Sequence, residues 1–240
     1  LLVHGSLGRD AATGRGLVFA IREALKAHNM GELANQTYVF QGFGNVAAWA
    51  AEIVSEMGAK VLAASNTSGA IYNEKGLDIK ALRAHVAAGK PLVEFPGATP
   101  LGANEDVLHI KCDVLCPSAL GGVITGANAD KLQCKLIGEG ANGPITPAGD
   151  KILRDRGIIV LPDIYANGGG VTVSYFEWVQ NLQCFRWTEE EVNQRLDRTM
   201  TDAFAAIWSV HKAHKVPLRT AAFMLALQRV STAAVQRGFF

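Results

Sequence analysis

The 240-residue chain has almost no excess charge of either sign, because 23 Lys and Arg residues balance 22 Asp and Glu residues to leave a net charge of +1. A surface dedicated to nucleic acid carries an excess of positive charge, so we expect no nucleic-acid partner. The sequence also lacks any apolar run near the roughly 20 residues that a membrane-spanning helix needs, and we expect no membrane partner. It contains no repeat and no low-complexity tract.

Cysteine is scarce, and the cysteine and histidine residues do not form the pattern of a metal site. Cys112 and Cys116 are not followed by a second Cys or His pair at a zinc-finger spacing, and His211 and His214 have no acidic neighbour in the sequence. We therefore predict no metal site. We expect free, mostly buried thiols in a reducing compartment, with Cys184 either buried or accessible between two helices.

The N-terminal segment Leu1–Gly5 has neither the charged region, the long apolar region nor the cleavage site of a signal peptide. With the reduced thiols, this predicts a cytoplasmic location, or the mitochondrial matrix if the source is eukaryotic. The sequence does not begin with methionine, so we expect it to be a piece of a longer protein.

What the sequence has is a hydrophobic content of 49%, which predicts a globular chain with a substantial core. Short strand-forming runs alternate with helical patterns. The predicted strands are 36–41, 60–64, 113–116, 135–138 and 158–161, and the helices between and before them are 14–29, 45–57, 78–88, a short one at 105–110, and 147–156. Such alternation implies parallel pairing through right-handed crossovers, so we predict an α/β fold with a doubly wound, Rossmann-like, mostly parallel sheet.

The strand signal ends near residue 165, and three helical stretches follow at 168–184, 189–214 and 217–237. We therefore predict two parts. Residues 1–165 form a dinucleotide-binding domain, and residues 166–240 form a C-terminal helical appendage that packs on the sheet or reaches another domain.

The strand, turn and helix at Gln36–Ala47 contain the string Gly-x-Gly-x-x-Ala, which is typical of dinucleotide binding in this context. Gly42 permits the sharp turn, Gly44 has no Cβ to block a pyrophosphate, and Ala47 lets the helix lie close to its strand. The helix N-terminus offers free N–H groups and partial positive charge to phosphates. Such a turn alone also occurs without a ligand, so it needs support from its surroundings.

Polar or glycine-rich loops follow successive predicted strands and supply that support. They are Gly42–Asn45, Ser65–Ser68, Pro117–Gly122, Glu139–Pro144 and Asp163–Gly170. Ligands of open α/β sheets bind beyond the carboxyl ends of the strands, and five such loops at one edge are hard to explain as turns alone. The sequence therefore predicts a cofactor site along this edge.

Two questions about the site stay open from the residues alone. Asn66 stands where many dinucleotide sites have an acid that bonds the ribose 2′-OH, and an amide neither selects NAD nor repels the 2′-phosphate of NADP. Thr13 is either the N-cap of the first helix or, with Arg9, faces the nicotinamide end of the site.

Seven segments together resemble glutamate dehydrogenase of the Glu/Leu/Phe/Val dehydrogenase superfamily. They are Gly5–Gly16, Gln41–Val46, Ser68–Asn73, Ala119–Ile124, Glu139–Pro144, Leu161–Asn167 and Gly169–Asn181. The similarity covers essentially the whole chain in unbroken order, and Val171–Asn181 resembles the glutamate branch more than the branches acting on other amino acids. The resemblance implies reversible oxidative deamination of L-glutamate to 2-oxoglutarate and ammonia with NAD or NADP, in a homohexamer. The alternatives are a Leu/Phe/Val-type dehydrogenase or a non-catalytic nucleotide-sensing subunit.

The resemblance also implies site residues. The cofactor-binding set is Arg9, Thr13, Gly42, Gly44, Asn45, Val46, Asn66, Ala119, Asn142 and Asn167. In it, Thr13 and Asn167 would bond the nicotinamide carboxamide, Asn45 the pyrophosphate, and Asn142 would lie near the nicotinamide ribose. Ser174 would bond the substrate's side-chain carboxylate, with Val171 lining the same pocket. A hydroxyl there favours a polar side chain over an apolar one.

The family's catalytic lysine and aspartate belong to an N-terminal substrate domain, which nothing in this chain matches. We therefore predict no catalytic residue among the 240, and we expect residues 166–240 to contact that missing domain. The chain alone should bind cofactor without turning over glutamate.

Overall fold

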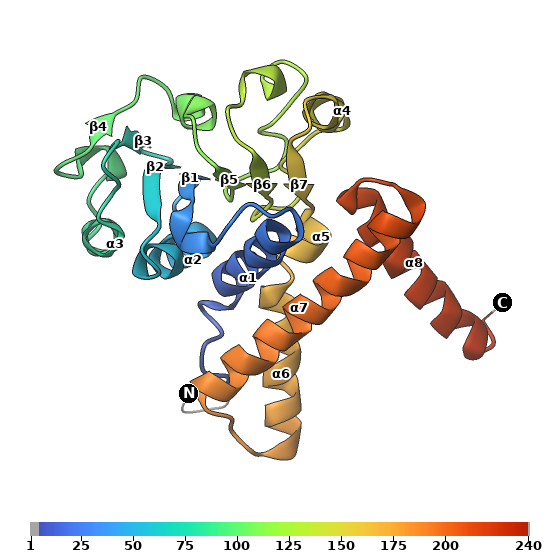
Figure 1. Cartoon of the computed structure of the whole chain (residues 1–240). Coiled ribbons are helices and arrows are strands. Elements are labelled where there is room, and N and C mark those ends of the chain that lie inside the picture. The colour runs from blue at the N-terminus through green and yellow to red at the C-terminus, as the bar shows by residue number, and fades with distance from the viewer. Residues whose placement is uncertain (1–4, 240) are drawn as a thin grey trace.

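A seven-stranded sheet forms the centre of the computed structural model, which describes residues 5–239 (Figure 1). The residues Leu1–His4 of the predicted N-terminal segment lie outside this range. The strands are β1 (Thr37–Gln41), β2 (Lys60–Asn66), β3 (Gly69–Tyr72), β4 (Thr99–Pro100), β5 (Val114–Pro117), β6 (Leu136–Gly138) and β7 (Ile159–Leu161). They lie in the order β4-β3-β2-β1-β5-β6-β7, and the five strands from β2 to β7 in that order are parallel. The predicted α/β fold is confirmed.

Within residues 5–239, eight α-helices accompany the sheet. They are α1 (Ala12–Ala27), α2 (Asn45–Glu56), α3 (Ile79–Ala87), α4 (Pro147–Asp155), α5 (Asp163–Ala166), α6 (Gly169–Gln183), α7 (Glu189–His214) and α8 (Leu218–Gln236). Asp78 caps α3 by accepting a bond of 3.0 Å from the Ala81 N–H. The capping interpretation of Thr13 is wrong, because the N-cap of α1 is Ala11 and Thr13 lies in the first helical turn.

Helices cover both faces of the sheet. Successive residues of each strand point to opposite faces, so their side chains pack into different buried clusters. Tyr38 and Phe40 of β1 belong to one buried cluster with α1 and α2, whereas Val39 between them belongs to a second cluster. That second cluster includes Leu153 of α4 and Val107 of a 3₁₀ helix at Asn104–His109. In Figure 1 the first set of helices lies below the sheet and α4 lies above it.

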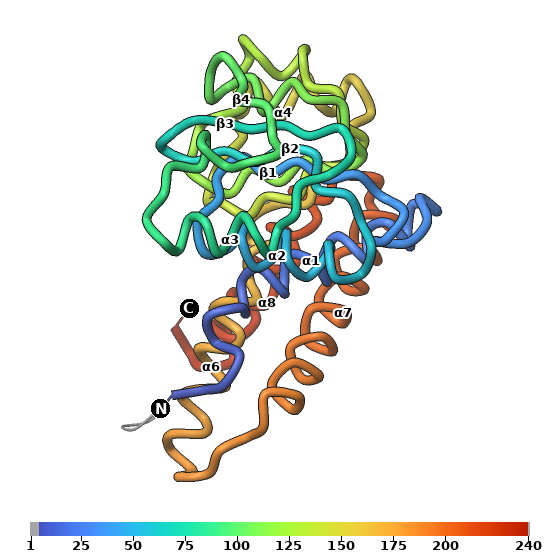
Figure 2. The backbone as a smooth tube through the Cα atoms, turned by 90° about the vertical axis from the view of Figure 1, so that its left-hand side faces the viewer, coloured from blue at the N-terminus to red at the C-terminus, as the bar shows by residue number. Residues whose placement is uncertain are grey.

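The last three helices extend the first layer away from the sheet, and α6 and α7 project below it in both views (Figure 2). Leu196 and Phe204 of α7 share the buried cluster of α1. Arg22 of α1 forms an ion pair with Asp197 of α7 and donates to the Thr201 hydroxyl at 3.0 Å. These contacts fix α7 across α1.

Two glycines let α6 begin directly against α1. A Cβ on Gly16 would lie 2.7 Å from the Gly169 Cα, which no real side chain tolerates. The close approach brings the first turns of the two helices together, and these turns carry Thr13 and Ser174.

The antiparallel edge of the sheet is absent from our sequence prediction. β2 runs on to Asn66, and a tight turn through Thr67 and Ser68 leads into β3, so the predicted loop Ser65–Ser68 is partly strand. β4 lies in the segment Pro91–Pro100, which the sequence indicates as irregular. Both added strands are four residues or fewer, too short for a clear alternating pattern.

The four cysteines are free thiols with different surroundings. Cys112 and Cys116 are buried, Cys134 is half-buried, and Cys184 is exposed at the left-handed C-cap of α6. Burial raises the pKa of the Cys116 thiol far above its usual range, which makes it unreactive. Among residues 5–239, no helix is long and apolar enough to cross a membrane.

Candidate functional site

The carboxyl ends of β1 and β5 form the crevice where a doubly wound sheet binds its ligand. β2 lies on one side of β1 and the strands β5, β6 and β7 lie on the other, so the chain connections diverge at this point. Gly42 directly follows β1 with φ of +95°, and a Cβ at this position would lie 2.8 Å from the Ala119 Cβ. Only glycine therefore fits the turn that starts the crevice.

The N-terminus of α2 is open toward this crevice. Gly44 is its N-cap, no side chain caps the helix, and no atom lies within 4 Å of where a Gly44 Cβ would be. The first-turn amides of Asn45 and Val46 have no intrahelical acceptor. Asn45 uses its side-chain NH₂ to hold the preceding loop, donating to the Asp10 carbonyl at 2.8 Å. The uncapped helix and the missing Cβ fit the pyrophosphate of a dinucleotide.

A cavity of about 500 Å³ continues from this helix end. Eight residues predicted from the sequence line it: Arg9, Thr13, Val46, Ala119, Asn142, Asn167, Val171 and Ser174. The structure adds Ser118, Gly140, Ala141 and Gly170 to the lining. The predicted residues come from α1 and the turn before it, from α2 and α6, and from the loops after β5, β6 and α5. The fold thus gathers groups that are up to 165 positions apart, from Arg9 to Ser174.

Two amides meet in this cavity. The Asn167 NH₂ donates to the Asn142 side-chain oxygen at 2.7 Å and more weakly to the Gly140 carbonyl at 3.4 Å. The Asn142 NH₂ and the Asn167 side-chain oxygen have no partner among residues 5–239. One donor and one acceptor side by side match a carboxamide, which presents one of each.

The first two turns of α6 also line the cavity, through Gly170, Val171 and Ser174. The Ser174 hydroxyl donates to the Gly170 carbonyl at 3.1 Å, a bond it would exchange to donate to a substrate carboxylate. Val171 is 72% exposed beside it. The Arg9 Nε lies 3.9 Å from a carboxylate oxygen of Glu177, which belongs to α6. This ion pair holds the positive charge of Arg9 beside the cavity.

Asn66 does not line the cavity. It ends β2, and its side-chain oxygen accepts bonds of 2.8 Å from both the N–H and the hydroxyl of Ser68. Its NH₂ is therefore the group left for a ligand. An amide donor suits a ribose hydroxyl and a phosphate equally well.

A buried ionic network behind the cavity was not predicted from the sequence. Glu139 has no exposed surface, and it accepts bonds from Arg219 of α8 at 2.5 and 3.1 Å and from the Asp163 N–H at 2.7 Å. Asp163 in turn accepts a bond of 2.7 Å from the Gly143 N–H, next to Asn142. Arg219 thus holds the loop that carries one of the two amides.

Burial and pairing act against each other in this network. Burial raises the pKa of the Glu139 carboxyl, and the two bonds from Arg219 favour its charged form. Burial alone would lower the pKa of Arg219, but the bonds to Glu139 and Asp150 raise it above its ordinary value, so the guanidinium stays charged. No local sequence pattern predicts the Glu139–Arg219 pair, because its members are 80 residues apart. In the part of the chain that the structure describes, no group of three His, Cys, Asp or Glu residues is placed to hold a metal ion.

Comparison with known proteins gives a consistent result. The family model described as Glutamate/Leucine/Phenylalanine/Valine dehydrogenase matches residues 5–238. The glutamate dehydrogenase of Peptoniphilus asaccharolyticus is 37% identical with a TM-score of 0.83, and the match covers 98% of this chain and 55% of that one. The hetero-hexameric enzyme of Thermus thermophilus, in its Leu-bound form, is 32% identical with a TM-score of 0.89, covering 100% and 56%. The enzyme of Plasmodium falciparum is 29% identical with a TM-score of 0.90, covering 99% and 53%.

The chain thus spans about half the length of these solved structures.

Proposed function

This chain belongs to the Glutamate/Leucine/Phenylalanine/Valine dehydrogenase family. From that premise we propose that it is the cofactor-binding portion of an NAD- or NADP-dependent glutamate dehydrogenase, which interconverts L-glutamate with 2-oxoglutarate and ammonia. The observation that carries the proposal is the shared cavity, which is lined by Val46 at the open N-terminus of α2, by the Asn142–Asn167 amide pair and by Ser174. These groups suit a phosphate, a carboxamide and a substrate carboxylate, which is what a bound nicotinamide dinucleotide and glutamate would present.

Each part of the cavity then has a role. The amides of Asn45 and Val46 would hold the pyrophosphate, and Gly44 would leave room for it. Thr13 and Asn167 would orient the carboxamide, with Asn142 at the adjoining ribose, and Asn66 would meet the adenosine ribose. The nicotinamide, when bound, supplies the hydride chemistry.

The substrate side of the reaction is shared with the missing half of the protein. Ser174 would donate a hydrogen bond to the substrate's side-chain carboxylate, and Val171 would contact its methylene groups. Arg9, beside the same opening, adds positive potential that favours an anionic substrate. A lysine and an aspartate in an N-terminal substrate domain would supply the acid–base chemistry, which none of the residues lining this cavity supplies. We also propose that the complete protein is a homohexamer.

The proposal is tested by separating binding from turnover in residues 1–240. Calorimetry with NADH and with NADPH should show saturable binding of at least one of them, and the ratio of the two dissociation constants assigns the cofactor that Asn66 leaves open. The same sample should show no glutamate-dependent reduction of either nucleotide. Turnover by this chain alone would mean that it contains the acid–base groups, and it would contradict their assignment to an N-terminal substrate domain. Binding without turnover even in the complete protein would favour the nucleotide-sensing alternative.

Replacing Ser174 by valine in the complete protein tests the substrate assignment. Because one bond to a charged carboxylate is lost, kcat/KM for glutamate should fall about a hundredfold, while that for an apolar amino acid such as norvaline should stay or rise. Thr172→Val is the matched control, because the Thr172 hydroxyl makes the same kind of bond, 2.9 Å to Gly168, on α6 but outside the cavity. Equal losses for both substrates would contradict the role of Ser174.

A further inference from the structure

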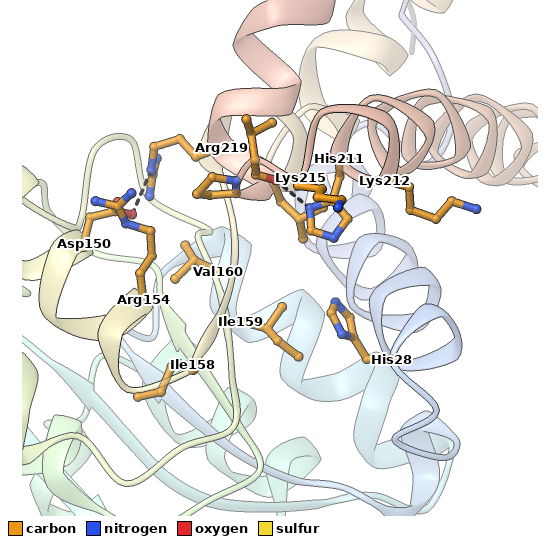
Figure 3. A pocket seen from close by; sticks show the side chains of 14 residues that line it. His28, Asp150, Arg154, Ile158, Ile159, Val160, His211, Lys212, Lys215 and Arg219 are labelled. Carbon is orange, nitrogen blue, oxygen red and sulfur yellow. Dashed lines mark hydrogen bonds and ion pairs between the residues drawn. The ribbon is translucent and has the colours of Figure 1, made fainter.

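A second cavity, of about 530 Å³, lies away from the cofactor cavity and shares no lining residue with it. It is bounded by the C-terminal ends of α1, α4 and α7, by the start of α8, and by β7 (Figure 3). Ile159 begins β7 and Ile158 directly precedes it, so this part of the cavity lies at the amino end of the strand.

The floor of this cavity is apolar. Ile159 and Val160 of β7 form it together with Leu218 of α8. β7 is the last strand of the sheet, and the Ile159 N–H and the Leu161 carbonyl both bond toward β6, at 3.1 and 3.2 Å. The backbone N–H and carbonyl of Val160 therefore lie on the outer edge, which no strand among residues 5–239 covers. The apolar body of a ligand can contact the side chains of Ile159, Val160 and Leu218 beside this edge.

The rim of the cavity carries an excess of positive charge. Arg154, Lys212 and Lys215 stand there with a single carboxylate, Asp150, which is already bound by Arg154 and Arg219 at 3.2 Å each. Lys215 has no hydrogen-bond or ion-pair partner among residues 5–239. In Figure 3 its side chain lies close to His211, whereas Lys212 extends away from the other labelled side chains. Lys215 is thus an unpaired cation at the cavity.

Two histidines, His28 and His211, also line this cavity. The His28 Nε2 is buried and has no hydrogen-bond partner among the residues that the structure describes, which usually marks the place of a water or a ligand atom. His211 is oriented by a bond of 2.7 Å between its Nδ1 and the Val216 carbonyl. Trp208 packs between the rings, 5.0 Å from His28 and 4.7 Å from His211. Burial and the neighbouring His211 lower the pKa of His28, so at neutral pH it is an uncharged polar group.

We propose that this cavity binds an organic monocarboxylate with an apolar body. The carboxylate lies between Lys215 and the His28 ring, and the apolar body lies on Ile159, Val160 and Leu218. Lys215 supplies the charge that the anion needs, His28 supplies the unsatisfied polar atom, and the side chains of Ile159, Val160 and Leu218 supply the apolar surface. The site is separate from the proposed dehydrogenase function and does not depend on it.

Octanoate titrated into residues 1–240 tests this site, with calorimetry and ligand-detected NMR as readouts. Saturable one-to-one binding in the millimolar range or tighter is expected, at or below about 10 mM. Lys215→Met and His28→Phe should each weaken it about tenfold or more, because each removes one bond to the carboxylate. Lys111→Met removes an exposed charge elsewhere and should leave the affinity unchanged. Thermal melting of each variant shows whether it is folded.

Three outcomes would overturn the proposal. One is the absence of saturable octanoate binding by the folded wild-type chain. Another is an equal loss of octanoate affinity in the Lys215→Met and Lys111→Met variants, which would indicate that any positive charge on the surface contributes equally. The third is displacement of octanoate by NADH in proportion to nucleotide bound, which would place the octanoate in the cofactor cavity instead.

Discussion

Gly42→Val is expected to abolish measurable NADH binding and to lower the free energy of unfolding by about 3 kcal/mol. Two effects combine. The backbone at Gly42 has φ of +95°, which a β-branched residue adopts only with strain, and a Cβ would lie 2.8 Å from the Ala119 Cβ and 2.9 Å from its N–H nitrogen. The turn must therefore open, and the N-terminus of α2 then no longer points at the crevice. Calorimetry and urea unfolding measure the two losses.

Two other glycines separate these effects. Gly58 has the same φ of +95° but no atom within 4 Å of a Cβ, so Gly58→Ala should cost about 1–2 kcal/mol in stability and leave NADH affinity unchanged. Gly44→Ala should be folded with nearly wild-type stability, because its φ is −85° and its Cβ would meet nothing, yet NADH should bind about tenfold or more weakly. Wild-type NADH affinity in Gly44→Ala would contradict the placement of the pyrophosphate.

Arg219→Met is expected to lower the free energy of unfolding by about 3–5 kcal/mol, because it leaves the fully buried Glu139 without its cation. For a chain of this length, such a loss lowers the melting temperature by roughly 10 °C. NADH affinity should also fall, because Glu139 and Asp163 no longer hold Gly143 and with it the position of Asn142. Scanning calorimetry and NADH titration below the new melting temperature measure both.

The double variant Glu139→Gln with Arg219→Met should recover much of the lost stability, since no unpaired charge remains at position 139. Arg198→Met is the matched control, because the Arg198–Asp202 pair is exposed and 3.9 Å long and should contribute less than about 0.5 kcal/mol. A destabilisation below about 1 kcal/mol in Arg219→Met would mean that Glu139 is satisfied without it.

The parts of the fold that the sequence predicts are those encoded by local patterns. The helix α2 follows from the glycine turn at Gly42 and the helical pattern after it, and the alternation of strand-forming runs with helical patterns predicts the parallel sheet. β3 was missed because Gly69–Tyr72 is short and gains its place only by pairing with β2 and β4. Thr13 was open to two interpretations because a threonine before an apolar run suits an N-cap, and only the packing of α1 against α6 shows that the helix begins earlier.

The candidate site divides in the same way. The glycine turn and the loops after the strands have sequence signatures, and eight of the residues chosen with them line one cavity. The Glu139–Arg219 pair has no signature, because its partners meet only after β6 and α8 are packed together. The cavity beside His28 and Lys215 is likewise formed by segments distant in sequence, and of the two tail histidines only His211 lines it.

NADH titrated into ¹⁵N-labelled residues 1–240 shows whether a nicotinamide dinucleotide binds along the carboxyl edge of the sheet. We expect saturable binding with the largest amide shifts at Gly42–Val46, Ala119, Asn142 and Asn167, and with little change at His28 or Lys215. No saturable shift at millimolar NADH, or shifts confined to residues outside this edge, would contradict it.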